Sequence, residues 1–128
     1  QGNNMTVIFV FGSNEAGIHG KGAAKDAYRF HGAVWGCGVG HYGESYAIPT
    51  KDTRIRTLPL SDIKHYVAQF KRYAGAHPEL VFKVTRIGCG LAGYTNEIIA
   101  PMFIGSSPNC LFDKAWEPII GNENGYWN

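Results

Sequence analysis

Residues 80–93 read LVFKVTRIGCGLAG, a run of β-branched and apolar residues that passes directly into glycines. The first eight predict a buried strand, and the glycines that follow predict a tight loop over Gly88–Gly93. Residues 6–12 read TVIFVFG and predict a second buried strand that also ends at a glycine-rich segment. Parallel strands end at one edge of a sheet, so we expect Gly12–Gly22 and Gly88–Gly93 to line one cleft.

Helical patterns alternate with these strands. Apolar residues recur at helical spacing in three segments, residues 23–30, 61–77 and 95–104. Ser61 is the expected N-cap of the second helix and Pro78 follows its end, while Gly32 is the expected C-terminal cap of the first. Pro101 lies inside the third segment and is expected to distort or restart that helix.

Extended patterns predict short strands at residues 33–35, 45–49 and 109–112, and residues 109–112 are expected to form the last strand. Strands that alternate with helices in a chain of 128 residues indicate the α/β class. We expect a three-layer α/β/α sandwich with a mixed, partly parallel sheet, in which crossovers are right-handed.

The composition describes one compact domain. The chain has 128 residues, 17 of them glycine, and 12 Lys and Arg against 10 Asp and Glu give a net charge of +2. A chain of this length buries a sizeable core without metal or disulfide support. We assign residues 5–128 to a single domain and exclude residues 1–4, because Gln1 and Gly2 resemble the remnant of a cleaved tag.

Several partner classes are excluded by the sequence pattern. No basic stripe is present, so duplex nucleic acid is not expected as the main partner. No apolar stretch approaches the ~18 residues of a transmembrane helix, so no membrane partner is expected. The three cysteines have no CxxC spacing and fit reduced thiols, which indicates a cytoplasmic protein. Trp116, Tyr126 and Trp127 need cover, either from their own domain or from a homo-oligomeric contact.

No cofactor or metal is expected. A phosphate-binding P-loop would need Gly in place of Glu15 and Ser or Thr in place of Gly22. The segment Gly36–Gly40 lacks the third glycine and the following helix of a dinucleotide fingerprint, which disfavours hydride transfer with NAD. The five histidines include no pair at metal-ligand spacing on one helix.

The two glycine-rich segments are the candidate binding elements. Gly88–Gly93 joins a strand to a helix, so its backbone N–H groups can turn inward beside the positive end of the helix dipole. Gly17–Ala24 also enters a helix and has small residues at the helix start. Both arrangements suit a phosphate or diphosphate, and the alternative is that the glycines only permit tight turns.

Four motifs in this order resemble the macrodomain superfamily: FGSN at residues 11–14, HGKGAA at 19–24, AIPTK at 47–51 and RIGCGL at 86–91. The resemblance spans roughly residues 7–104. It is closest to the terminal ADP-ribose glycohydrolase branch and to macrodomain-like non-structural proteins of phages and prophages. Members of the superfamily bind ADP-ribose, so the resemblance implies binding of ADP-ribose or a related NAD-derived nucleotide.

The resemblance also implies which residues touch the ligand. Gly20–Ala23 corresponds to the family's loop around the distal ribose and diphosphate, and Gly88–Tyr94 to its phosphate-binding loop. The expected ligand-binding residues are Gly12, Asn14, His19, Gly20, Gly22, Ala23, Gly88, Cys89, Gly90, Leu91, Ala92, Gly93 and Tyr94. Asn14 either faces the distal ribose hydroxyls or closes an Asx turn, and Tyr94 either stacks on the ligand or packs on the next helix. His19 is either a phosphate contact or a solvent-facing loop residue.

Lys51 and Asn14 are the candidate catalytic residues. In the glycohydrolase branch a lysine attacks the anomeric carbon of the distal ribose and an aspartate resolves the adduct. Lys51 matches the lysine, but Ala92 occupies the position of the aspartate. Asp52 is a substitute only if the strand has ended, because consecutive side chains of a strand face opposite ways. The alternative for Lys51 is a surface lysine that pairs with ligand phosphate or solvent.

Three functions follow from this pattern. The first is a binding module that holds the nucleotide without turning it over, which in a phage protein would sequester a nucleotide signal of the host. The second is an ADP-ribosyl glycohydrolase that uses Lys51. The third is a phosphatase acting on ADP-ribose 1''-phosphate, which also lies within the range of the superfamily.

Overall fold

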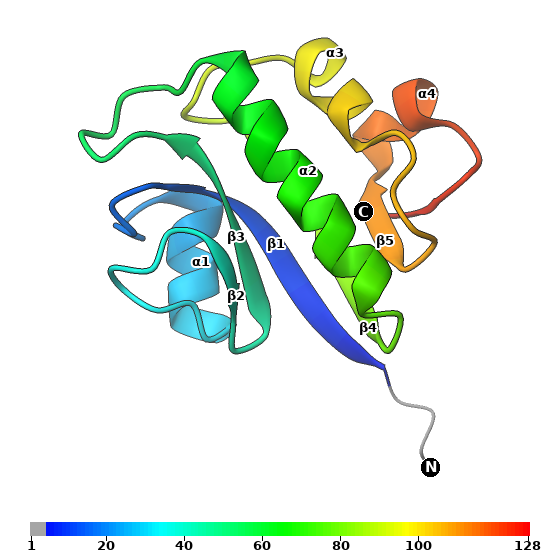
Figure 1. The fold of residues 1–128 in the computed structure, drawn as a ribbon, viewed down its shortest axis with the longest axis horizontal. Helices are drawn as coiled ribbons and strands as arrows, with labels where there is room; N and C mark the ends of the chain where they lie inside the picture. Colours follow the sequence, from blue (N-terminus) through cyan, green and yellow to red (C-terminus); the bar gives the residue numbers. More distant parts are fainter. Residues whose placement is uncertain (1–4) are drawn as a thin grey trace.

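The computed structural model describes residues 5–128, and the assignment of residues 1–4 to a tag remnant lies outside the described residues. One six-stranded sheet runs through the molecule in the order β2-β3-β1-β4-β5-β6 (Figure 1). The strands are β1 (Thr6–Asn14), β2 (Gly40–Tyr42), β3 (Ser45–Lys51), β4 (Leu80–Val84), β5 (Cys110–Asp113) and β6 (Gly125–Trp127). All neighbours are parallel except β2 and β3. The predicted α/β class with a mixed, partly parallel sheet is therefore confirmed.

The helices lie on both faces of this sheet (Figure 1). Helix α1 (Gly22–Phe30) lies on one face, and α2 (Leu60–Ala76) crosses the other. The chain then forms α3 (Asn96–Ile99), the 3₁₀ turns η1 (Ala100–Phe103) and η2 (Lys114–Trp116), and α4 (Glu117–Ile120). Pro101 lies at the start of η1, so the predicted restart of the helix occurs there, because proline fits a first helical turn but not a helix interior.

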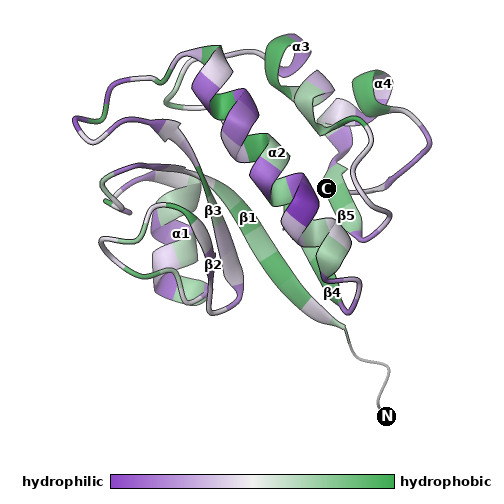
Figure 2. Cartoon of the chain, viewed as in Figure 1, coloured by the Kyte–Doolittle hydropathy of each residue, from purple (hydrophilic) through white to green (hydrophobic). Residues whose placement is uncertain are grey.

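Alternating side chains of the central strands build a separate core on each face. In β1, Ile8 and Val10 join the larger cluster with Phe70 of α2, whereas Phe11 joins the smaller cluster with Ala27 of α1. Figure 2 shows β1 almost uniformly apolar and α2 striped with hydrophobic and hydrophilic residues, as expected for a doubly covered strand and a half-buried helix. Burial on both faces holds the end of β1 in place, where the site lies.

Three predicted details are wrong. Residues 33–35 form no strand, because Ala33 N–H bonds to the Ala27 carbonyl at the end of α1 and the Val34 carbonyl accepts from Cys37 N–H in a turn. Ser61 is not the N-cap of α2, which begins at Leu60 after Pro59 and has no side-chain cap. The strand predicted at residues 109–112 is present as β5 but is not the last, since β6 follows.

The C-terminal aromatic residues pack against their own domain. Trp116 is fully buried in the larger core. Trp127 in β6 donates from Nε1 to the Val84 carbonyl at 3.0 Å, and Lys83 Nζ lies 4.4 Å from its ring centroid. Of the two expected ways of burying these aromatic side chains, the structure shows packing against their own domain.

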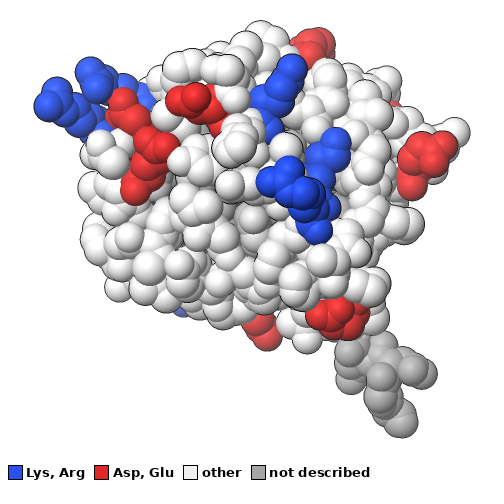
Figure 3. Space-filling view, viewed as in Figure 1, with Lys and Arg blue, Asp and Glu red and all other residues white. Residues whose placement is uncertain are grey.

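The charged side chains are dispersed. On the face shown in Figure 3, the basic side chains form separate groups with acidic side chains beside and around them, and they do not merge into one stripe. Among residues 5–128, no helix combines the length and the apolar character that crossing a membrane requires.

Candidate functional site

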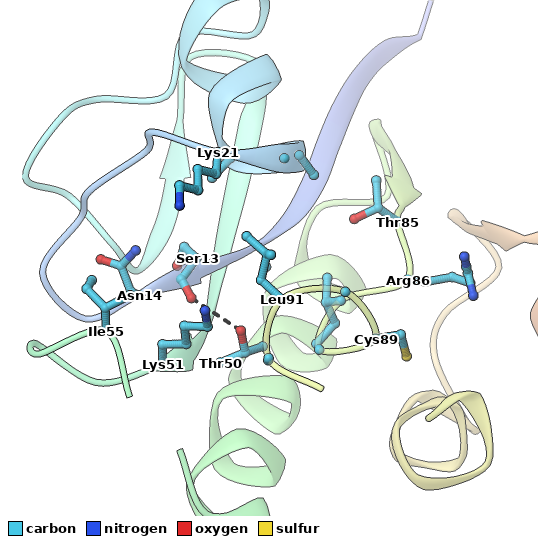
Figure 4. A pocket seen from close by; sticks show the side chains of 18 of the residues that line it. Ser13, Asn14, Lys21, Thr50, Lys51, Ile55, Thr85, Arg86, Cys89 and Leu91 are labelled. Carbon is cyan, nitrogen blue, oxygen red and sulfur yellow. Dashed lines mark hydrogen bonds between the residues drawn. The ribbon is translucent and has the colours of Figure 1, made fainter. Parts of the chain in front are cut away.

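A cavity of about 590 Å³ opens at the carboxyl ends of β1, β3 and β4 (Figure 4). It lies between the start of α1 and the loop that follows β4, so the structure brings both glycine-rich segments to one site. Most of the expected ligand-binding residues line it, namely Gly12, Asn14, Gly20, Gly22, Ala23, Gly88, Cys89, Gly90, Leu91 and Ala92, and so does Lys51. The volume lies within the range of ~300–1,000 Å³ that is usual for small-molecule sites.

The loop after β4 presents unpaired backbone donors to this cavity. Its turn is held by N–H bonds from Gly93 to the Gly90 carbonyl and from Tyr94 to the Gly88 carbonyl. The N–H groups of Gly88, Gly90, Leu91 and Ala92 have no acceptor within the described chain. All four of these residues line the cavity. Backbone N–H groups that lack a protein acceptor and lie together in a glycine-rich loop are suited to bind an anion.

The start of α1 presents a second group of donors. The helix has nine residues, and Lys21 at the N-cap makes no side-chain bond to its first turn. The N–H groups of Gly22, Ala23 and Ala24 have no acceptor among residues 5–128, and these residues line the same cavity. The partial positive charge of the helix terminus adds to the attraction for an anion.

The side-chain charges of the cavity have one sign. Lys21, Lys51 and Arg86 line it, and none of its lining residues in the described chain is Asp or Glu. Figure 4 shows Lys21 and Lys51 extending toward the cavity from opposite sides, whereas Arg86 extends away from it. Arg86 donates instead to Asn96 Oδ1 at 3.3 Å. The cavity is therefore electropositive, and the positively charged side chains that extend toward it are Lys21 and Lys51.

Asn14 closes a loop with its amide. Its Nδ2 donates to the Ile18 carbonyl at 2.8 Å, and its Oδ1 accepts from Ile18 N–H at 2.9 Å. The amide thus holds its own loop, as the alternative for Asn14 expected, but it bonds to Ile18, four residues on, and not two residues on as in an Asx turn. One Nδ2 proton and one Oδ1 lone pair stay free for a second partner, because an amide group has two donors and two acceptor positions.

Lys51 ends β3 where the pairing with β1 shifts register between Ser13 and Asn14. Its carbonyl accepts from Glu15 N–H at 2.9 Å, which fixes its backbone. Within residues 5–128 its ammonium group has no carboxylate partner. Ala92 lines the same cavity, but its side chain is only a methyl group. Of the lysine and aspartate pair that the resemblance implies, the lysine, Lys51, is in the cavity, and Ala92 stands where the aspartate is expected.

The Asp52 carboxylate is engaged in hydrogen bonds within its own turn, outside the cavity. Its Oδ1 accepts from the N–H groups of Arg54 and Arg56 at 2.8 and 2.9 Å, and its Oδ2 accepts from Arg56 Nε at 3.1 Å. The Arg56 N–H, opposed by desolvation and assisted by Arg54, lowers the pKa of this carboxyl group. Asp52 does not line the cavity and serves as the acceptor of a tight turn, so it does not replace the missing aspartate.

His19 and Tyr94 do not line the cavity, contrary to the expectation that they contact ligand, and His19 is buried, so it is not the solvent-facing residue of the alternative either. His19 is 1% exposed, and its Nε2 lies 2.9 Å from the Val34 carbonyl and 3.2 Å from the Cys37 carbonyl. Tyr94 packs against the larger core and donates from its hydroxyl to the Leu58 carbonyl at 2.7 Å. Both side chains position loops, and Gly93 is likewise absent from the lining.

Cys89 lines the cavity as a thiol. Burial raises its pKa, with Arg86 opposing, so at neutral pH it is not the thiolate that a nucleophile requires. Within residues 5–128, no cluster of three or more His, Cys, Asp or Glu side chains is arranged to hold a metal ion.

Some lining residues were missed by sequence reasoning. These are Ser13, Ile18, Lys21, Thr50, Ile55, Thr85, Arg86 and Ile87 among others. Several are strand-end residues, and the rule that ligands bind beyond the carboxyl ends of parallel strands would have found them. Ile55 carries no such signal, because it comes from a turn that folds back toward the sheet.

Comparisons of the chain with family models, with curated proteins and with solved structures found no match. The resemblance to macrodomains therefore stays a prediction carried by the four motifs.

Proposed function

We propose that this protein binds ADP-ribose, or a related NAD-derived nucleotide with a diphosphate group, in the cavity between its two glycine-rich segments. The observation that carries the proposal is the set of seven unpaired N–H groups, at residues 22–24 and at residues 88 and 90–92, that belong to one cavity. A diphosphate has enough acceptor oxygens to satisfy donors on both walls, whereas a single carboxylate does not.

Charge and size agree with this ligand class. Lys21 and Lys51 extend toward the cavity and no carboxylate lines it, so a ligand with two negative charges is attracted. The volume of about 590 Å³ exceeds what an inorganic diphosphate fills and leaves room for sugar or base. The resemblance of Gly20–Ala23 and Gly88–Tyr94 to the ribose and phosphate loops of macrodomains favours ADP-ribose within this class.

Binding without efficient turnover is the proposed mode. Lys51 lines the cavity, but Ala92 supplies no acid or base and the Asp52 carboxylate is held by its own turn. Loss of a general acid or base typically lowers a rate by about 10²–10⁴. A protein of this kind would sequester its nucleotide. Hydrolysis of ADP-ribosyl linkages is the second candidate, favoured by the position of Lys51 alone.

A thermal-shift panel tests the proposal. ADP-ribose, ADP, NAD and inorganic pyrophosphate are compared with adenosine, which lacks the phosphates. A ligand that binds only the folded state stabilises it by about 2.7 kcal/mol at a hundredfold excess over Kd. We expect ADP-ribose to raise the melting temperature most and adenosine to have no effect. If the folded protein responds to none of the phosphorylated ligands, the proposal is wrong. Mass spectrometry of copurifying small molecules would identify the ligand directly.

A further inference from the structure

Three large aliphatic side chains that line the cavity are exposed to solvent. Ile18 is 42% exposed, Ile55 is 41% exposed and Leu91 is 68% exposed. They come from three different segments, one before α1, one after β3 and one after β4. Exposed apolar groups that share one cavity are a mark of ligand contact, because a bound molecule would remove them from water.

Ile55 is held in an unfavourable backbone conformation. Its φ is 63°, and it is the one non-glycine residue with positive φ in the described chain. This left-handed region disfavours a β-branched side chain and suits glycine or asparagine. The turn is imposed by Asp52, whose carbonyl accepts from Ile55 N–H at 3.1 Å and whose carboxylate accepts from the N–H groups on either side.

This turn is tied to the anion-binding loop by two hydrogen bonds. Thr57 Oγ1 donates to the Ala92 carbonyl at 3.0 Å, and Tyr94 donates from its hydroxyl to the Leu58 carbonyl. A bridge between Lys51 and Thr57 closes the base of the turn. Ile55 therefore keeps a defined position relative to the unpaired N–H groups of the loop.

We infer that Ile55, together with Ile18 and Leu91, forms an apolar clamp over the uncharged ribose or base of the bound nucleotide. The clamp determines specificity: it favours an organic diphosphate over inorganic pyrophosphate, which the N–H groups bind without its help. The inference rests on the proposed function and deepens it. A residue keeps an unfavourable positive φ only where the surrounding structure imposes it. A contact between the Ile55 side chain and the ligand explains why isoleucine occupies a position that suits asparagine.

The test uses Ile55→Asn, which removes the apolar group and relieves the backbone. Ile104→Asn is the matched control, because Ile104 is also exposed, at 50%, and does not line the cavity. Ile55→Val retains a branched apolar side chain. Calorimetry measures affinity for ADP-ribose, competition measures affinity for inorganic pyrophosphate, and circular dichroism measures the melting temperature of the ligand-free protein.

We expect Ile55→Asn to weaken ADP-ribose binding about tenfold, to leave pyrophosphate affinity unchanged and to keep or raise the melting temperature. Ile104→Asn is expected to bind ADP-ribose like the wild type, and Ile55→Val, which keeps a branched apolar side chain, is expected to bind ADP-ribose more tightly than Ile55→Asn does. Unchanged ADP-ribose affinity in Ile55→Asn, an equal loss of both ligands, or a fall in melting temperature would overturn the clamp. A wild type that binds ADP-ribose but not pyrophosphate would also overturn it. A wild type that binds neither ligand would instead refute the proposed function.

Discussion

Replacing Gly90 by valine tests most directly the proposal that the loop at residues 88–93 binds phosphate. A Cβ atom at Gly90 meets no heavy atom within 4 Å, and the backbone there is not in the left-handed region. Valine therefore fits the folded chain without strain. Because Gly90 lines the cavity, the branched side chain occupies space through which a phosphate would approach the N–H groups of Leu91 and Ala92.

The expected loss follows from the bonds that are blocked. A hydrogen bond to a charged group contributes about 1.5–3 kcal/mol. Loss of two such bonds costs at least about 3 kcal/mol, which raises Kd more than a hundredfold. The free energy of unfolding should change by less than about 1 kcal/mol, since removing a glycine also restricts the unfolded chain.

Isothermal titration calorimetry with ADP-ribose measures the affinity, and thermal circular dichroism measures the stability. Gly75→Val is the matched control, because Gly75 lies exposed on α2 with no heavy atom within 4 Å of an added Cβ. Gly20→Val, which also meets open space, applies the same test to the segment before α1. Wild-type affinity in Gly90→Val, or a parallel loss of binding and of folded signal, would refute the assignment of this loop to phosphate.

Three further predictions follow from the geometry. Ala92→Asp should raise hydrolysis of an ADP-ribosylated substrate above the wild-type background, and adding Lys51→Ala should abolish that gain; fast wild-type turnover that survives Lys51→Ala would contradict the lysine's role. Asp52→Asn should lower the melting temperature at pH 7, and the difference from the wild type should shrink as the pH falls below about 4, because a carboxyl group whose folded-state pKa is lowered loses its stabilising effect as it is protonated. Gly38→Ala should destabilise the protein by more than about 3 kcal/mol in denaturant unfolding, since an added Cβ would lie 2.0 Å from the Asn14 carbonyl oxygen.

The parts of the fold that the sequence predicts are those with local causes. β1 contains a continuous apolar run from Val7 to Phe11, β4 is apolar except for Lys83, and α2 has a regular apolar stripe, so burial and periodicity identify them. β6 has only three residues and no apolar run, and its position depends on pairing with β5 and on the contact of Trp127 with Val84. Such an element is specified by tertiary contacts, which a single sequence does not display.

In the candidate site, too, features with local causes are predictable from sequence and features that depend on distant contacts are not. Backbone loops are predictable, because glycines after a strand predict a turn at a known edge of the sheet, and ten of the thirteen expected binding residues line the cavity. The roles of side chains are not predictable in this way, because they depend on which groups of distant segments form hydrogen bonds with them. His19 is hydrogen-bonded to the carbonyls of Val34 and Cys37, and Tyr94 to the carbonyl of Leu58. For the same reason Asp52 looks in sequence like a spare acid beside Lys51, and in the structure its oxygens are already bound. A catalytic assignment in this site therefore needs a free carboxylate in the cavity, which is what Ala92→Asp introduces.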